Sequence, residues 1–129
     1  MGSSQRAKGA RGEREACKVA EARTGIPWRR TGSAQRRQGS GLPDIVPEEP
    51  PAGWGPEFDT YCGLLRLHIE VKYSENTTVW AALKQAAEDV GDSGRIPVVL
   101  FKRNRRGWTW HVPDEHLSRF VAVMQGGGE

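Results

Sequence analysis

Residues 65–72, LRLHIEVK, alternate strictly between apolar and polar side chains, and this pattern constrains the fold more than any other stretch of the chain. The apolar positions are Leu65, Leu67, Ile69 and Val71, and the polar positions are Arg66, His68, Glu70 and Lys72. Successive side chains of a β-strand point to opposite faces of the sheet, so a period of two predicts a half-buried strand. Residues two positions apart return to the same face, which places Glu70 and Lys72 side by side on the polar face.

The length of 129 residues matches one domain with a single modest core, and we expect flexible ends at about residues 1–6 and 125–129. No apolar run approaches the ~20 residues of a membrane-spanning helix, and the polar first residues lack the apolar stretch of a signal peptide. We therefore expect a cytoplasmic protein that contacts no membrane. Cys17 and Cys62 are far apart and form no CxxC pair, so we expect reduced thiols and no zinc site.

The net charge of +3 is unevenly distributed along the chain. Residues 1–40 hold ten Lys or Arg against three acids, residues 41–93 hold three against ten, and residues 94–129 hold six against three. A basic flank beside an acidic middle is typical of proteins in which basic residues contact a polyanion and acids hold a cation. A charged surface that contacts only solvent is the alternative explanation.

Periodicity and turn residues predict eight elements in the order α-β-β-β-α-β-β-α, which indicates a mixed sheet with helices packed on it. The expected helices cover residues 8–23, 79–90 and 114–124, and the expected strands cover residues 25–31, 42–46, 64–73, 96–102 and 108–112. Thr77 or Thr78 is expected to cap the second helix. Residues 47–63 are rich in Pro and Gly, so we expect an irregular excursion there.

Asp44 belongs to the short strand that precedes the excursion. If that strand pairs with residues 65–72, the carboxylates of Asp44 and Glu70 converge. Carboxylates a few ångströms apart repel each other, but a hard divalent cation takes oxygen ligands and reverses the sign of that cost. The backbone carbonyl of Val71 can add a further oxygen, and the ammonium of Lys72 can offset negative charge on a phosphate in the transition state. A Glu–Lys pair that merely stabilises a sheet is the alternative.

The same residues resemble the PD-(D/E)XK nuclease superfamily, with PD at residues 43–44 and EVK at residues 70–72. The stretch KGARGEREACKVAEARTG, residues 8–25, resembles the first helix of archaeal-type Holliday-junction resolvases. RIPVVLFKRNRRGWTWHV, residues 95–112, resembles the late strand pair of the same family. The resemblance implies a restriction-endonuclease-like α/β fold, in which helices flank a mixed β-sheet.

Four catalytic residues follow from this resemblance, namely Glu13, Asp44, Glu70 and Lys72. It implies that Asp44, Glu70 and the Val71 carbonyl hold Mg²⁺, for which Mn²⁺ substitutes, and that Glu13 completes the site directly or through water. No organic cofactor is implied. The 25 residues between Asp44 and Glu70 exceed a simple hairpin, so the convergence of the two acids depends on how the excursion returns.

The resemblance also implies DNA contacts. Arg14 matches a basic residue near the scissile phosphate, Arg29 and Arg30 compete for one position of the family, and Ser33 and Ser40 compete for another. Further arginines and lysines in expected loops are candidates for phosphate contacts, rather than for solubility alone: Arg36, Arg37, Lys102, Arg103, Arg105 and Arg106.

Several polar and aromatic residues admit two interpretations. Gln85 lies off the apolar face of its helix and either reaches the site or contacts solvent. His68 shares the polar face with Glu70, where it either supports the site or packs as a neutral side chain. Trp108 and Trp110 lie on one face of a strand, which favours the core or a subunit interface over base stacking.

Together these features predict a Mg²⁺-dependent endodeoxyribonuclease of DNA recombination and repair. We expect it to resolve Holliday junctions by paired symmetric nicks that leave a 5′-phosphate and a 3′-hydroxyl, as the resemblance implies. The alternatives are a relative that cuts flaps, mismatches or duplex ends, and a DNA-binding module that has lost catalysis. A junction needs two symmetric nicks, so we expect a homodimer that acts on branched DNA and on no small-molecule substrate.

Overall fold

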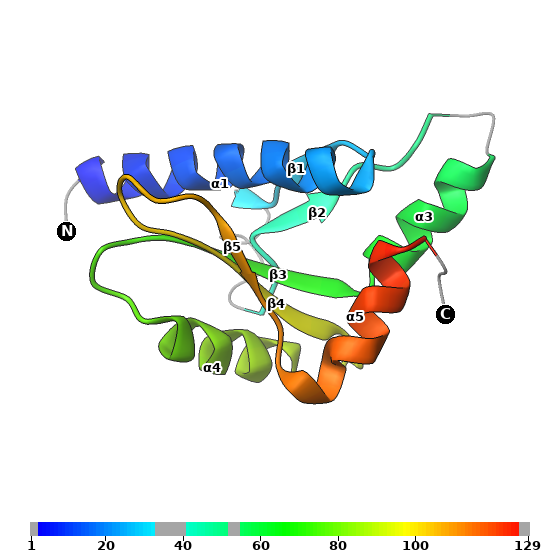
Figure 1. Ribbon diagram of the computed structural model, residues 1–129. Coiled ribbons are helices and arrows are strands. Elements are labelled where there is room, and N and C mark those ends of the chain that lie inside the picture. The colour runs from blue at the N-terminus through cyan, green and yellow to red at the C-terminus, as the bar shows by residue number, and fades with distance from the viewer. Residues whose placement is uncertain (1–2, 33–40, 52–54, 127–129) are drawn as a thin grey trace.

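The computed structural model describes residues 3–32, 41–51 and 55–126, and the side chains of α1 from Lys8 onward. A five-stranded mixed sheet forms its centre, with helices on both faces (Figure 1). The elements are α1 (Ser3–Thr24), β1 (Trp28–Arg30), β2 (Ile45–Pro47), α3 (Pro56–Leu64), β3 (Leu67–Tyr73), α4 (Val79–Val90), β4 (Ile96–Lys102), β5 (Thr109–His111), the 3₁₀ turn η1 (Asp114–His116) and α5 (Leu117–Met124).

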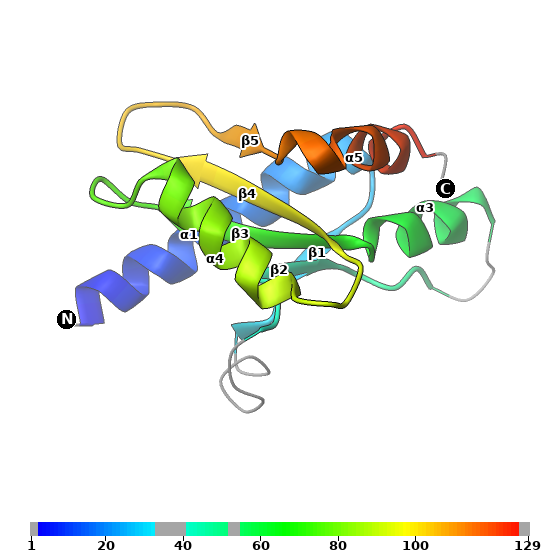
Figure 2. The same ribbon diagram turned by 90° about the horizontal axis from the view of Figure 1, so that it is seen from below.

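The strands lie side by side in chain order, β1-β2-β3-β4-β5. Only β3 and β4 are parallel, and α4 connects them, as the crossover of a parallel pair requires. The other neighbours are antiparallel, and β2 pairs with β3 at a single position, Ile45 opposite Ile69. Figure 2 shows α4 on one side of the sheet and α1 on the other.

Two apolar clusters hold these layers together. The larger lies between α1 and the sheet, where Ala16 and Ala20 pack against residues that include Ile69 and Leu100. The smaller lies on the opposite face, where Ala82 and Ala86 of α4 pack against Val99 and Phe101 of β4. Small residues on both helices allow them to approach the sheet closely.

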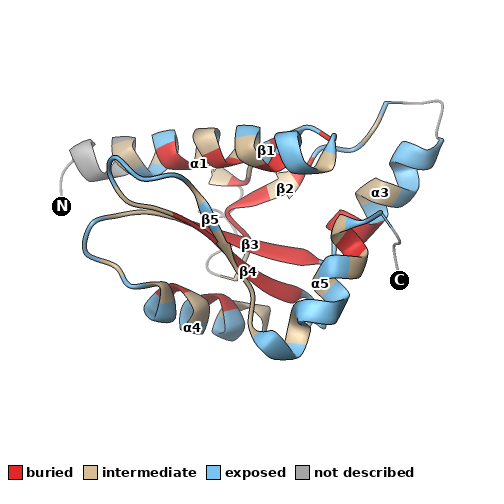
Figure 3. Cartoon of the chain, viewed as in Figure 1, coloured by how far each residue is buried: buried red, intermediate tan, exposed pale blue. Residues whose placement is uncertain are grey.

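Helix α4 confirms the expected cap, because the Thr78 side chain accepts a hydrogen bond from the N–H of Ala81 at 3.0 Å. Its buried positions Ala82 and Ala86 lie four residues apart on one face, as helical periodicity predicts. Its outer residues are exposed (Figure 3).

Two expectations were wrong. The excursion contains a regular helix, α3, so the order is α-β-β-α-β-α-β-β-α, and Pro56 starts that helix at a position where proline is tolerated. Strand β3 is not half-buried, because His68 and Glu70 on its polar face are only 1% and 2% exposed. Helix α4 covers part of that face, as its contacts with β3 show.

Smaller differences concern the boundaries of elements. Helix α1 begins at Ser3 and therefore includes residues expected in a flexible end. The final helix starts with the 3₁₀ turn η1 at Asp114 before it continues as α5. Among the described residues, no helix is both long and apolar enough to pass through a membrane.

Candidate active site

Asp44 lies where β2 begins to pair with β3, and hydrogen bonds with β3 help to hold it there. Its backbone N–H donates to the carbonyl of Ile69 at 2.8 Å, and its carboxylate Oδ2 accepts from the N–H of Val71 at 2.8 Å. The pairing of Ile45 with Ile69 brings the Pro-Asp segment beside β3, and the Glu70 carboxylate lies close enough to Asp44 for its charge to raise the pKa of Asp44. The long excursion thus returns the chain so that the two acids lie side by side.

Strand β1 fixes the Pro-Asp segment from the other side. The Thr31 hydroxyl donates to the carbonyl of Pro43 at 2.6 Å, and the Thr31 N–H donates to the carbonyl of Asp44 at 3.0 Å. Thr31 is itself buried, so these bonds are shielded from water. Asp44 is consequently held on both sides by strand neighbours.

The carboxylate of Asp44 lies in an unfavourable electrostatic environment. Burial raises its pKa to about 7, and the negative charge of Glu70 is the next largest cause. The hydrogen bond from Val71 and the charge of Lys72 oppose that rise of the pKa, whereas the charge of Glu13 adds to it. The four residues expected to be catalytic therefore act on one another across this part of the sheet.

The carbonyl of Val71 faces the same edge of β3 as its N–H, because both groups of a strand residue point toward the same neighbouring strand. That N–H points to Asp44. The carbonyl oxygen therefore lies on the side of β3 where Asp44 lies, as a ligand role requires. Asp44, Glu70 and this carbonyl offer only oxygen atoms, the donor type that Mg²⁺ prefers.

Glu13 reaches this region from α1 and is held by an arginine. Arg30 Nε donates to Glu13 Oε1 at 2.9 Å, and both side chains are partly buried. Neighbouring side chains of a strand point to opposite faces, and Arg29 is exposed. Of the two arginines expected to compete for one DNA contact, Arg30 is therefore the one that lies beside a candidate site residue.

Lys72 is half-buried at the end of the EVK segment. Within the described part of the chain, no carboxylate lies within ion-pair distance of its ammonium. A lysine near two carboxylates that is not committed to an ion pair can contact an incoming phosphate.

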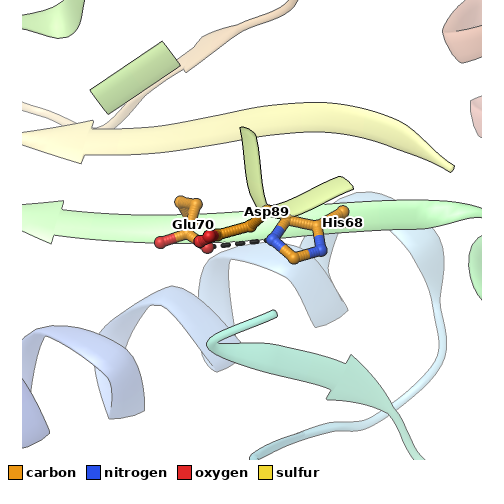
Figure 4. A group of neighbouring side chains, drawn as sticks. All are labelled: His68, Glu70 and Asp89. Atoms are coloured by element: carbon orange, nitrogen blue, oxygen red, sulfur yellow. Dashed lines mark hydrogen bonds and ion pairs between the residues drawn. The ribbon is translucent and has the colours of Figure 1, made fainter. Parts of the chain in front are cut away.

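Glu70 also contacts His68, whose role the sequence left open. His68 Nε2 lies 2.9 Å from Glu70 Oε2, and both side chains are buried. Asp89 of α4 approaches the same pair, so that one potential ligand atom from each residue lies within 4.8 Å of the others (Figure 4). His68 therefore contacts the candidate site, and sequence reasoning missed Asp89. Its position three residues after the buried Ala86 was the available signal.

The side chains expected to contact DNA differ in their exposure and in the contacts that they already make. Arg14, Arg105 and Arg106 are exposed. Arg103 donates to the carbonyls of Glu75 and Thr77, and its guanidinium lies over the Phe101 ring, 5.2 Å from the centroid. A pocket of about 530 Å³ lies beside this turn, with Arg103, Arg105, Arg106 and Trp108 in its lining. Ser33, Arg36, Arg37 and Ser40 lie outside the described residues.

Lys102 lies in the expected strand over residues 96–102 and not in the adjoining loop, where a phosphate contact was expected. It is the last residue of β4, where it pairs with Tyr73 of β3. Its ammonium donates to Glu15 Oε1 at 3.1 Å, an ion pair that also lowers the pKa of Glu15. Lys102 thus joins α1 to the sheet.

The remaining candidates have structural roles or are exposed. Trp108 and Trp110 pack against the larger apolar cluster, and the Trp110 ring lies 6.2 Å from that of Phe120. This arrangement favours core packing over base stacking. Gln85 is exposed on α4.

No protein-family model, curated protein or solved structure matches this chain.

Proposed function

We propose that the protein is a metal-dependent, structure-selective DNA endonuclease that resolves Holliday junctions. One observation carries the proposal: Asp44 is hydrogen-bonded to Val71, the residue after Glu70, so the Pro-Asp and Glu-Val-Lys segments meet where β2 pairs with β3. The mixed sheet with helices on both faces suits a restriction-endonuclease-like fold.

In this proposal Asp44, Glu70 and the Val71 carbonyl hold Mg²⁺, and Glu13 completes the site. The donor set fits the ion because it consists of oxygens. Burial and the charge of Glu70 disfavour the ionised form of Asp44, and a bound cation would stabilise that form. When bound, the ion would lower the pKa of a water molecule and polarise the phosphate.

The side chains of the protein contribute the remaining steps. Lys72 offsets the charge that builds on the phosphate as its bond to the leaving oxygen breaks. Arg30 holds Glu13 toward the site through their 2.9 Å contact. The exposed arginines Arg14, Arg105 and Arg106 bind the phosphate backbone and supply affinity that does not depend on sequence.

The test compares cleavage of a four-way junction, a flap, a linear duplex and a single strand in Mg²⁺. We expect the junction to be cut fastest. Lys72→Ala should slow cleavage roughly 10²- to 10³-fold, because it removes charge stabilisation from the transition state. It should leave DNA binding nearly unchanged, because exposed arginines supply the affinity.

Lys84→Ala is the matched control, since Lys84 is an exposed lysine of α4. Equal cleavage by Lys72→Ala and Lys84→Ala would contradict the site. Faster cleavage of flaps or duplex ends would favour the related nuclease, and binding without any cleavage would favour the inactive module.

A further inference from the structure

We propose that His68, Glu70 and Asp89 form a second cation site, which binds a first-row transition-metal ion through one imidazole nitrogen and two carboxylates. The site shares Glu70 with the proposed nuclease site, but its other two residues are His68 of β3 and Asp89 of α4. It takes an ion such as Mn²⁺.

The geometry brings the three donors to one point. His68 and Glu70 are two positions apart on β3 and share a face, while Asp89 comes from α4, which packs over that face (Figure 4). One potential ligand atom of each residue lies within 4.8 Å of the other two. Ligands that surround one ion at about 2.1 Å lie some 3 to 4 Å apart, so small side-chain movements suffice for coordination.

The negative charges of Glu70 and Asp89 favour a bound cation beside His68. Glu70 is almost fully buried and Asp89 is half-buried. Across the described residues, neither carboxylate forms an ion pair with a lysine or an arginine, and His68 is the single basic partner of Glu70. Two neighbouring carboxylates that form no ion pair with a lysine or an arginine are a favourable place for a divalent ion, which takes carboxylate oxygens as ligands.

The donor set distinguishes this site from the one at Asp44. An imidazole nitrogen suits first-row transition metals, whereas an all-oxygen set suits Mg²⁺. The site at His68 would therefore prefer a transition-metal ion over Mg²⁺, whereas the site at Asp44 accepts Mg²⁺. If the proposed function is correct, an ion held by His68 and Asp89 would also fix the orientation of Glu70 toward its nuclease ligands. That last step rests on the proposed function, but the binding of the ion does not.

Pulsed electron paramagnetic resonance of bound Mn²⁺ tests the proposal without any DNA. The full chain, free of a histidine tag and stripped of metal, is titrated with Mn²⁺, and modulation from a coordinated ¹⁴N nucleus is recorded. We expect this signal in the unaltered protein and its loss in His68→Gln. The matched control is His111→Gln, because His111 lies on β5 and is a member of no described metal cluster. It should keep the signal.

Asp89→Asn is a second variant, chosen because Asp89 is only half-buried whereas His68 is fully buried. It should stay folded and bind Mn²⁺ at this site ~10-fold more weakly or worse, because it removes one charged ligand. The proposal is overturned by an absent ¹⁴N signal at saturating Mn²⁺, by a signal that survives in His68→Gln, or by unchanged Mn²⁺ affinity in Asp89→Asn. A ¹⁴N signal in a protein that cuts no DNA would support the cation site and contradict the nuclease.

Discussion

The backbone N–H of Val71 donates its hydrogen bond to the side chain of Asp44, at 2.8 Å, and not to a backbone carbonyl of β2. A carboxylate thus replaces part of the ladder between β2 and β3, which pair at only one position. This contact fixes Asp44 beside Glu70 in a buried place. The raised pKa of Asp44 is the electrostatic consequence.

Asp44→Asn should stabilise the metal-free protein at alkaline pH. The pKa of Asp44 rises from its ordinary value of 3.8 to about 7 on folding, so the folded state holds its proton more tightly. Stability contributed by the protonated form is therefore present at low pH and is lost as the pH rises to about 7. At pH 8 we expect the variant to be more stable by roughly 1 to 3 kcal/mol.

Urea unfolding at pH 5 and pH 8 measures this difference. The advantage of Asp44→Asn should shrink at pH 5, and Mg²⁺ should stabilise the unaltered protein more than the variant. Asp92→Asn is the control, because Asp92 is exposed after α4 and its replacement should change little at either pH. A variant no more stable than the unaltered protein at pH 8 would contradict the electrostatic account of Asp44.

Gly12→Ala should disturb the contact between α1 and β3. A Cβ at Gly12 would lie 2.8 Å from the Cβ of Tyr73, so the helix or the strand must shift. We expect a loss of about 1 to 3 kcal/mol in the free energy of unfolding. Gly9→Ala is the matched control, since a Cβ there meets nothing within 4 Å and should stabilise the helix by up to ~1 kcal/mol. Equal stability of the two variants, measured by chemical unfolding, would argue against this packing.

Local patterns in the sequence predict most elements of the fold. The alternation in residues 65–72, the apolar run of β4 and the Thr78 cap each depend on neighbouring residues, so they can be recognised without the tertiary structure. The sequence pattern does not predict α3, because residues 47–63 taken together are rich in Pro and Gly, whereas residues 56–64 form a helix once Pro56 occupies its first turn.

The surroundings of the polar face of β3 could not be predicted from the sequence pattern. Periodicity identifies which side chains share a face, but not which distant element covers it. Asp89 approaches His68 and Glu70 only because α4 crosses back over the sheet between two parallel strands. The neighbourhood of Asp44 and Glu70 was expected from the motif, yet it required the antiparallel return of a 25-residue segment.

Replacement of Arg105 and Arg106 by Ala should weaken DNA binding. Both residues are exposed in the turn between β4 and β5 and line the pocket beside Trp108. Each lost phosphate contact should reduce the slope of log affinity against log salt by about 0.9 for duplex DNA. Fluorescence anisotropy at several salt concentrations measures the slope. Arg95→Ala is the control, because Arg95 precedes β4 at the opposite end of that strand. An equal slope in the double variant and the control would exclude this turn as a DNA contact.

The last prediction concerns assembly, because one chain with one site cannot place two symmetric nicks at once. We expect a homodimer with two-fold symmetry that matches the symmetry of a junction. Of the two places expected for Trp108 and Trp110, the core or a subunit interface, the structure shows the core, and Phe120 packs there as well. Leu117 and Val121 are exposed, at 45% and 41%, and lie one helical turn apart on α5, so we expect the dimer interface at these two residues.

Light scattering should give twice the chain mass of 14.3 kDa for the unaltered protein. Leu117→Asp combined with Val121→Asp should yield a monomer that remains folded, because charge is added only to exposed positions. Trp80→Ala tests the competing surface, since Trp80 is 80% exposed on α4. Dissociation by Trp80→Ala alone would move the interface to α4, and a protein that stays monomeric at micromolar concentration would refute the dimer.

Cleavage of a supercoiled cruciform plasmid tests whether the dimer is the active form. The dimer should produce linear DNA, because it makes both cuts in one binding event. The monomeric variant should accumulate nicked circles, because its two cuts would need two separate binding events.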